Sequence, residues 1–400
     1  MKSNWQTVRL NECCEFVRGV SFQNGDARTN AEAGFIPLLR AGNIANNLDL
    51  ENDLIWVPER LTAHEQKLQK GDIAICLSSG SPQVVGKTAQ LKQDWTGTVG
   101  AFCGIVRPGK GVDSEFIGHW FRSPHFINWR NAKARGANIQ NLRFQELAEL
   151  DILLPSKKDE QRRIAARLRE QMAEVERSRA TVEAQLDAAQ SLPAALLRAI
   201  FTSPAAQRWP RRRLGDVLET RNDIIHPRNK PTGTATFVGL EHIEPNTGRR
   251  IGSIEIDKAV MTGRKAQFFK GDIVYGYLRP YLNKVWIAEF DGLCSVDQYV
   301  YQVNNELAVT PFVAWFMRSS TYLERAPIGG SPGQLPRIRM EEVAATEINL
   351  PPIAEQQKIA ARLDAELTAA RSLVETLETR LAEIELLPAT LLRSAFSQQN

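Results

Sequence analysis

The string IAARL occurs twice in this chain, at Ile164–Leu168 and again at Ile359–Leu363. Farther along, LPAALLR at Leu192–Arg198 returns as LPATLLR at Leu387–Arg393. Both strings return after the same number of residues. A helix explains this constant separation, because one inserted residue would rotate an apolar helix face by about 100°. The two strings therefore predict two copies of one long helix.

Other strings repeat in the same order upstream of these helices. They are WQTVRL at Trp5–Leu10 with WPRRRL at Trp209–Leu214, KGDI at Lys70–Ile73 with KGDI at Lys270–Ile273, and Phe116 and Arg122-Ser123 with Phe312 and Arg318-Ser319. Their separations differ slightly, as small loop insertions would produce. Chance does not place so many matches in one order, so the chain is an internal duplication.

Each long helix carries one apolar stripe with alternating steps of four and three residues. The residues expected to pair the helices are Ile164, Leu168, Met172, Val175, Val182 and Leu186 in the first copy, and Ile359, Leu363, Leu367, Val374, Leu377, Leu381 and Ile384 in the second. This spacing is close to the heptad seam of a coiled coil. We expect the helices to pair antiparallel about a pseudo-twofold axis and to span about 45 Å over about 30 residues. The alternative is that each helix packs against its own globular domain.

The regions before the helices are predicted to be compact mixed α/β domains rich in short strands. Runs such as 72–77 and 272–277 suit strands entered from a Gly-Asp turn. One helix is expected from Asp113 or Ser114 through Phe121, and another from Thr310-Pro311, with threonine as the N-cap and proline in the first helical position. The expected fold class is α/β (mixed): two β-rich domains separated by a pair of long antiparallel coiled-coil helices. The expected bounds are 1–155 and 202–351 for the domains, the second with a short leading linker, and 156–201 and 352–400 for the helices.

Composition excludes several classes of protein. The five cysteines form no C-x-x-C pair, which argues against a disulfide framework and a zinc ribbon. No apolar run approaches the roughly 18 residues of a membrane span, and the polar N-terminus lacks a signal-peptide core, so we expect a cytoplasmic protein. The net charge of +4 permits contact with nucleic acid, although a stronger positive surface would have to come from partners.

No catalytic motif is apparent. The segment Gly80–Thr88 resembles a phosphate-binding loop, but it has one residue too many between its glycines, and Pro82 removes a backbone donor. The segment Asn349–Ile353 has the wrong order for the loop of a base-modifying methyltransferase and no aromatic residue. We therefore expect neither an enzyme nor a metal site in this chain.

Polar, basic and amide-bearing side chains gather in the globular halves, and such side chains read base edges and phosphates. The candidate DNA-binding residues of the first half are Arg40, Asn43, Ser78, Ser79, Ser81, Lys87, Arg135, Asn138, Gln140, Asn141 and Arg143. Those of the second half are Arg279, Tyr281, Asn283, Lys284, Gln334, Arg337 and Arg339.

The chain resembles the specificity (S) subunit of type I restriction–modification enzymes over nearly its whole length. The strings that carry this resemblance are Leu154-Pro155 followed by Glu160-Gln161, Leu350-Pro351-Pro352 followed by Glu355-Gln356, Ile36–Arg40 with Gly42-Asn43-Ile44, and Arg279–Lys284. The first copy departs from the pattern only in its single proline.

The resemblance implies two target-recognition domains, each of which reads one half of a bipartite, asymmetric DNA site. It implies that the helices set the gap and dock two methyltransferase (M) subunits. The partners expected from it are double-stranded DNA, these M subunits and restriction (R) subunits. S-adenosylmethionine, ATP and Mg are expected in the partners, with no cofactor in this chain.

Two alternatives stay open from the sequence. The first is a specificity subunit of a system that fuses restriction and modification in one partner chain, as type IIB-like systems do. The second is a coiled-coil scaffold without a DNA role, which explains the helices but not two β-rich domains with polar amide loops.

Overall fold

The computed structural model covers the 400-residue chain, and the residues that it describes are 5–81, 83–135, 141–326 and 335–396. The chain divides into two compact units. Unit 1 comprises Met1–Val182 and Arg380–Asn400, and unit 2 comprises Glu183–Thr379. The name domain 1 refers to the globular part of unit 1, which precedes its long helix. The name domain 2 refers to the globular part of unit 2, which lies between the two long helices in the sequence. Both are mixed α/β structures, which confirms the predicted fold class.

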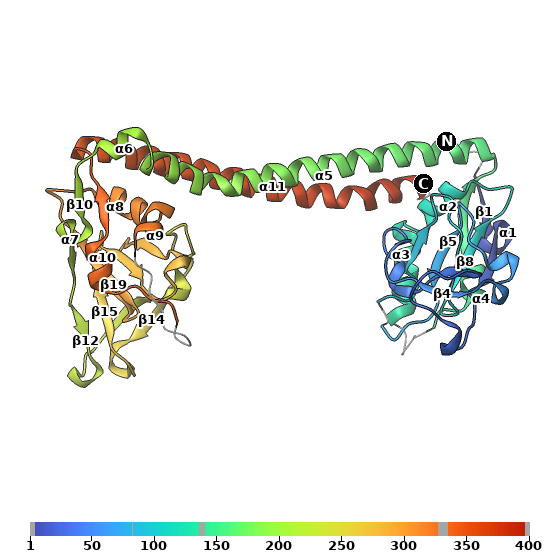
Figure 1. Cartoon of the computed structure of the whole chain (residues 1–400), viewed down its shortest axis with the longest axis horizontal. Helices are drawn as coiled ribbons and strands as arrows, with labels where there is room; N and C mark the ends of the chain where they lie inside the picture. Colours follow the sequence, from blue (N-terminus) through green and yellow to red (C-terminus); the bar gives the residue numbers. More distant parts are fainter. Residues whose placement is uncertain (1–4, 82, 136–140, 327–334, 397–400) are drawn as a thin grey trace. The chain divides into compact units, whose positions relative to one another are not determined.

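Domain 1 contains two main sheets and a two-stranded ribbon (Figure 1). The strands of the antiparallel sheet, in spatial order, are β2 (Cys14–Arg18), β8 (Cys103–Pro108), β5 (Ile73–Cys76) and β6 (Thr88–Gln90). Those of the second sheet are β4 (Ile55–Pro58), β3 (Phe35–Leu39) and β7 (Thr98–Val99), and the ribbon pairs β1 (Trp5–Arg9) with β9 (Asp151–Pro155). The helices are α1 (Leu10–Cys13), α2 (Ser114–Trp120), α3 (Pro124–Arg135) and α4 (Phe144–Ala148).

Domain 2 repeats this topology with two further short strands in its second sheet. The antiparallel sheet has the order β11 (Leu218–Thr220), β19 (Gln298–Val303), β16 (Ile273–Gly276) and β17 (Val285–Ile287). The second sheet has the order β12 (Ile224–Ile225), β15 (Lys265–Phe268), β18 (Gly292–Ser295), β13 (Thr234–Val238) and β14 (Ile254–Asp257), and the ribbon pairs β10 (Arg211–Arg213) with β20 (Glu347–Asn349). The helices are α6 (Pro204–Arg208), α7 (Leu214–Val217), α8 (Thr310–Met317), α9 (Ser320–Arg325) and α10 (Met340–Ala345).

The repeated Lys-Gly-Asp string forms the turn that leads into the central strand of each antiparallel sheet. Gly71 and Gly271 have φ angles of 99° and 92°, a conformation that a residue with a Cβ rarely adopts. The carboxylates of Asp72 and Asp272 accept hydrogen bonds of 2.8 Å from the backbone N–H of Gln69 and Phe269. The expectation that strands follow these turns is confirmed by β5 and β16.

The two helices predicted inside the domains differ in how well the sequence located their starts. Helix α2 has as its N-cap Asp113, one of the two predicted candidates, and the side chain accepts a hydrogen bond from Phe116 N. Helix α8 begins at Thr310, but its N-cap is Val309, one residue earlier than predicted. Val309 has no capping side chain, and its N–H donates instead to Oε1 of Gln356 on the following long helix. The first turn of α8 therefore has no side-chain cap, and this tertiary hydrogen bond holds its start in place.

The two long helices are α5 (Lys158–Phe201) and α11 (Ile353–Phe396), each with 44 residues. Proline stands inside each helix, at Pro193 and Pro388. All the residues of the predicted stripes are buried or half-buried. The stripes therefore face protein rather than solvent.

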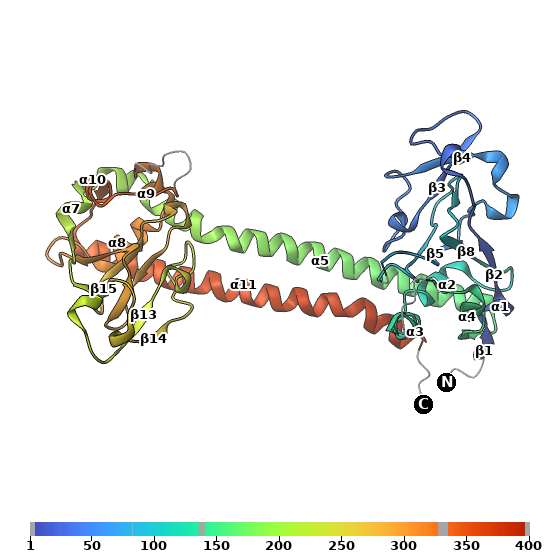
Figure 2. The same cartoon turned by 90° about the horizontal axis from the view of Figure 1, so that it is seen from below.

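Within each unit, one end of α5 and one end of α11 lie side by side (Figures 1 and 2). In unit 1, Leu168 of α5 and Leu392 of α11 belong to one core with Phe116 of domain 1. In unit 2, Leu197 of α5 and Leu363 of α11 belong to one core with Phe312 of domain 2. Since α5 leaves domain 1 and α11 returns to it, the segments run antiparallel. Each helix end therefore contacts both the other helix and a globular domain. Helix pairing and packing against a domain, which the sequence left as alternatives, occur together.

Candidate nucleic-acid interface

Two loops that are far apart in the sequence meet in each domain. In domain 1, Ser78, which follows β5, forms a β-bridge with Asn141, and Leu142 N donates to Leu77 O at 2.7 Å. The predicted clusters Ser78–Lys87 and Asn141–Arg143 therefore lie together, although more than fifty residues separate them in the sequence.

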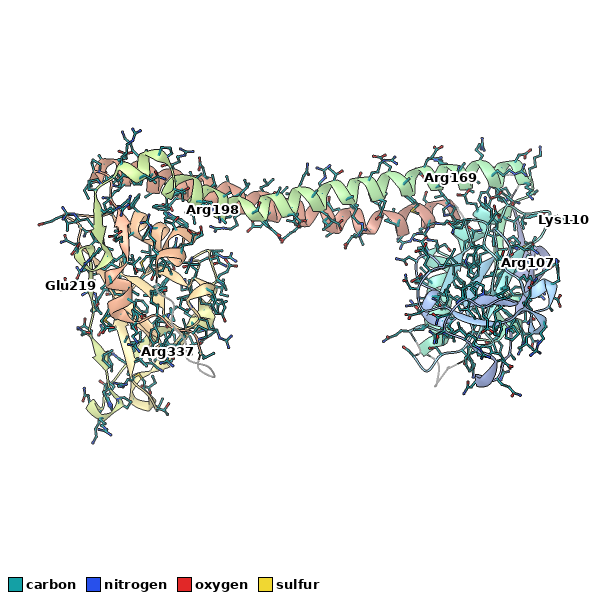
Figure 3. The ribbon with its side chains drawn as sticks, in the orientation of Figure 1. Arg107, Lys110, Arg169, Arg198, Glu219 and Arg337 are labelled. Atoms are coloured by element: carbon teal, nitrogen blue, oxygen red, sulfur yellow. The ribbon has the colours of Figure 1, made fainter. Side chains whose placement is uncertain are left out.

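Domain 2 brings its loops together in the same way. Leu278, which follows β16, forms a β-bridge with Arg337, and Ile338 N donates to Tyr277 O at 3.2 Å. Arg279 N also donates to Pro336 O at 2.8 Å. Figure 3 shows Arg337 on the side of this domain that faces away from Arg198 and the helices. The two predicted clusters of the second half are thus one surface.

A third loop reaches the same end of each domain. In domain 1 it follows β3 and holds Arg40, and in domain 2 it follows β13 and begins at Gly239. Both loops are closed by a side chain that accepts a hydrogen bond from the backbone: Asn43 Oδ1 from Arg40 N at 2.9 Å, and His242 Nδ1 from Gly239 N at 3.0 Å. We name the three-loop surface of each domain its loop face.

Many of the predicted contact residues are accessible on these loop faces. The exposed ones are Arg40, Ser81, Asn141, Arg143, Arg279, Tyr281, Arg337 and Arg339, whereas Ser78, Ser79, Lys87 and Lys284 are half-buried. Arg279 has a φ of 51°. Such left-handed conformations cost a residue other than glycine about 1 kcal/mol or more and tend to occur at functional sites.

Two predicted contact residues are internal instead. Asn43 is 3% exposed, and its amide also donates to Asn52 O at 2.8 Å. Asn283 is 1% exposed and donates to Arg318 O at 2.7 Å. In this structure both amides hold the loops in shape, and contact of these two residues with DNA stays a prediction. Lys284 has a related role, because its Nζ donates to Leu240 O at 2.6 Å and ties two loops of the face together.

Four predicted residues lie wholly or partly outside the described part of the chain. Asn138, Gln140 and Gln334 lie outside the described residues. Arg135 is the last residue of α3, and its side chain is not among the described parts of the chain. Their roles stay predictions.

The comparisons with known proteins agree with this duplicated architecture. The family model described as type I restriction modification DNA specificity domain matches residues 2–184 and again residues 207–386. The chain belongs to this specificity-domain family. It is 24% identical to the StySPI specificity subunit of Salmonella potsdam, over 99% of this chain and 89% of that protein. It is 25% identical to the EcoKI specificity subunit of Escherichia coli K12, with the same coverage.

Two solved structures have the same fold as this chain. One is a chain from a study titled as the structural basis of complex assembly and conformational transition of the type I R-M system, with a TM-score of 0.71 and 18% identity over 98% of both chains. Another is the HsdS subunit of Thermoanaerobacter tengcongensis, with a TM-score of 0.69 and 19% identity over 98% of this chain and 97% of that one.

The strings that suggested the specificity family have a structural role in this chain. Gln161 and Gln356, which close the two Glu-Gln pairs, are completely buried. Gln161 accepts from Asp113 N at 2.8 Å and donates to Pro155 O at 2.7 Å. Gln356 makes the equivalent bonds with Val309 N and Pro351 O. Each glutamine therefore fastens the first turn of a long helix to its domain.

A further repeat was missed at the sequence level. Arg143 and Arg339 are the N-caps of α4 and α10, and their N–H groups donate to the carboxylates of Glu146 and Glu342. The shared pattern of an aliphatic residue, arginine and a glutamate three positions later marks the same point of both loop faces. It was detectable because it recurs in the order of the other repeats.

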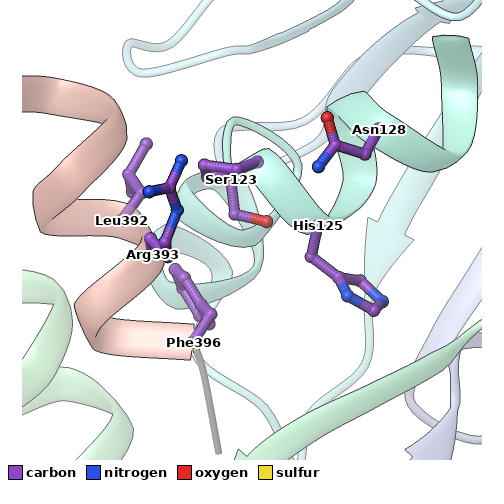
Figure 4. Close-up of a pocket in the computed structure, with 7 residues that line it drawn as sticks. Ser123, His125, Asn128, Leu392, Arg393 and Phe396 are labelled. Atoms are coloured by element: carbon purple, nitrogen blue, oxygen red, sulfur yellow. The ribbon is translucent and has the colours of Figure 1, made fainter. Parts of the chain in front are cut away.

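A small cavity lies elsewhere, where the end of α11 meets domain 1. It has a volume of about 200 Å³ and is lined by Ser123, Pro124, His125, Asn128, Leu392, Arg393 and Phe396. The side chains of His125 and Asn128 point away from each other (Figure 4). Ligand sites have polar groups that converge, so we do not assign this cavity to a ligand.

Among the described residues, no group of three or more His, Cys, Asp and Glu residues could hold a metal ion. No helix in the same part of the chain is both long and apolar enough to cross a membrane.

Proposed function

We propose that this chain is the sequence-specific DNA-recognition subunit of a type I restriction–modification complex. The observation that carries the proposal is the duplicated loop face. Two domains of one topology place their loops equivalently, yet Asn141 stands where domain 2 has Arg337. Two domains of the same fold that present different side chains are suited to recognise two different half-sites.

The proposal assigns each loop face one half of a bipartite, asymmetric DNA site. The paired helices are proposed to set the gap between the half-sites and to dock two methyltransferase subunits. Restriction subunits would complete the assembly. The relatives are named specificity subunits of type I restriction enzymes, which supports this assignment of partners.

The proposal makes this chain a recognition subunit without catalysis of its own. S-adenosylmethionine for adenine methylation, and ATP and Mg for translocation and cleavage, would be bound by the partner subunits. A subunit that reads DNA needs access to it, which favours the cytoplasmic location expected from the sequence.

Mapping methylated adenines tests the proposal. The chain is expressed with its cognate methyltransferase subunit, and the genomic DNA of the host is compared with that of a strain lacking this chain. We expect a single bipartite motif that disappears without it. A motif that persists in the absence of this chain would contradict the proposal.

A gel-shift experiment separates the proposed function from a coiled-coil scaffold without a DNA role. The purified chain and its methyltransferase partner are mixed with duplexes that carry the mapped motif or a scrambled one. A scaffold without a DNA role would show no preference for the motif. A partner in which restriction and modification are fused would instead be recognised from its own gene.

A further inference from the structure

Phe102 is an aromatic side chain in an unusual place. It lies in the turn between β7 and β8 and is 71% exposed. Single exposed apolar residues are common on proteins, so exposure alone assigns no role. The position of Phe102 is more informative, because this turn lies within the loop face of domain 1.

Hydrogen bonds fix the turn to two of the predicted contact loops. The carbonyl of Phe102 accepts from Leu77 N at 2.8 Å and from Ser78 N at 2.9 Å. On the other side, Gly100 N donates to Leu39 O at 2.9 Å, next to Arg40. Phe102 is thus held between the Arg40 loop and the Ser78 loop. A ring on a fixed backbone contacts a ligand at a low cost in conformational entropy.

Domain 2 has a different chemistry at the equivalent position. The residue whose carbonyl accepts from Tyr277 N is Asp297, at 3.4 Å. Its carboxylate also accepts from Ser295 Oγ at 3.1 Å. The two loop faces therefore present a phenyl ring and a carboxylate at corresponding points, which is the kind of difference that separates two half-sites.

We infer that the ring of Phe102 contacts a base, packing against the 5-methyl group of a thymine in the half-site that domain 1 reads. The inference rests on the proposed function. Thymine is the base that offers an apolar group in the major groove, and phenylalanine is one of the side chains that contacts it. The neighbouring polar side chains of Ser78 and Asn141 suit hydrogen bonds to the adjoining base edges and phosphates.

Replacing thymine by deoxyuridine removes this methyl group alone and tests the inference. The complex of the full chain with its methyltransferase subunit is titrated with duplexes that carry the mapped motif, in which the thymines of both half-sites are replaced one at a time. For the wild-type chain we expect a loss of affinity of about fourfold at one thymine, the effect of withdrawing one methyl group from an apolar contact. The Phe102→Ala variant should bind the unmodified motif more weakly by a similar or larger factor, and the deoxyuridine at that thymine should have no further effect.

Two more variants complete the experiment. Phe102→Leu keeps an apolar side chain and should keep the sensitivity to deoxyuridine. Val260→Ala removes another exposed apolar side chain, at the end of β14 opposite the loop face, and should behave like the wild type. The inference is overturned if no deoxyuridine weakens wild-type binding, or if Phe102→Ala stays sensitive at the same thymine. A wild-type complex that does not distinguish the motif from scrambled DNA would instead refute the proposed function.

Discussion

At the scale of residues, Asp72 and Asp272 illustrate how a duplicated turn keeps its buried charge compensated. Both carboxylates are needed as caps of the Lys-Gly-Asp turn, and each is paired with an arginine at 2.7 Å. The arginines come from different places: Arg107 lies on β8, whereas Arg221 follows β11. A buried carboxylate without a partner is strongly destabilising, so a cation must be supplied, but the strand that supplies it is free to change.

The buried glutamines give the first prediction at this scale. In Gln161→Ala or Gln356→Ala, a backbone N–H and a proline carbonyl lose their partner where the helix begins. Each substitution should lower the free energy of unfolding by about 1–3 kcal/mol, which urea denaturation measures. Gln357→Ala, at the exposed neighbouring position, is the matched control and should be close to neutral. Equal effects of the buried and exposed substitutions would contradict the role assigned to the glutamines.

Because of His119, we expect the stability of the folded chain to depend on pH. Its burial, together with the nearby charges of Arg122 and Lys92, lowers the pKa of His119 from the ordinary 6.5 to about 4. The unfolded chain therefore binds a proton more readily, and the folded chain should lose stability as the pH falls from about 6.5 towards 4, by at most about 3 kcal/mol.

The variant His119→Phe isolates this contribution, because a phenyl ring does not titrate. Melting temperatures of the wild type and the variant are compared between pH 4 and pH 7. The difference between the two curves should change across the window in which the histidine of the unfolded chain is protonated. Parallel curves would show that His119 does not cause the loss of stability.

At the scale of elements, the stripes of α5 and α11 predict which leucines stabilise the fold. Leu363, a residue of the α11 stripe, is completely buried and belongs to the core of unit 2 with Leu197 and Phe312. Leu363→Ala should cost about 2–5 kcal/mol, as truncation of a buried leucine does. Leu386→Ala removes a leucine that is 67% exposed on α11 and should change the stability little. Thermal unfolding measures both, and similar losses would mean that the stripe is not the packed face.

The elements also show where local sequence patterns fail. Asp113, one of the two N-caps that the sequence offered for α2, caps that helix with its own side chain. Helix α8 has no capping side chain, although Val309 N donates to Gln356 of α11 just as Asp113 N donates to Gln161 of α5. A local pattern contains no information about such contacts from elsewhere in the chain.

At the scale of the whole molecule, the proposed gap-setting role of the helices gives the last prediction. Removing residues 178–181 together with 373–376 shortens both helices by about one turn and keeps their apolar faces close to their original orientation. We expect the motif found by adenine methylation mapping to keep both half-site sequences and to have a shorter gap. The matched control substitutes the same residues with alanine, without changing the length. Altered half-sites with an unchanged gap would contradict the proposed role.

The sequence by itself determined the duplication, the two long helices and their stripes, since periodic and repeated patterns depend on neighbouring residues. It also indicated the polar loops of both domains. Only the tertiary structure decided which of their side chains are accessible: Asn43 and Asn283 face inward, whereas Phe102, which composition did not single out, faces outward. The reason is physical. Burial and hydrogen bonding of a loop residue depend on segments far away in the sequence, such as Asn52 for Asn43 and Arg318 for Asn283, and these contacts have no period that a sequence can display.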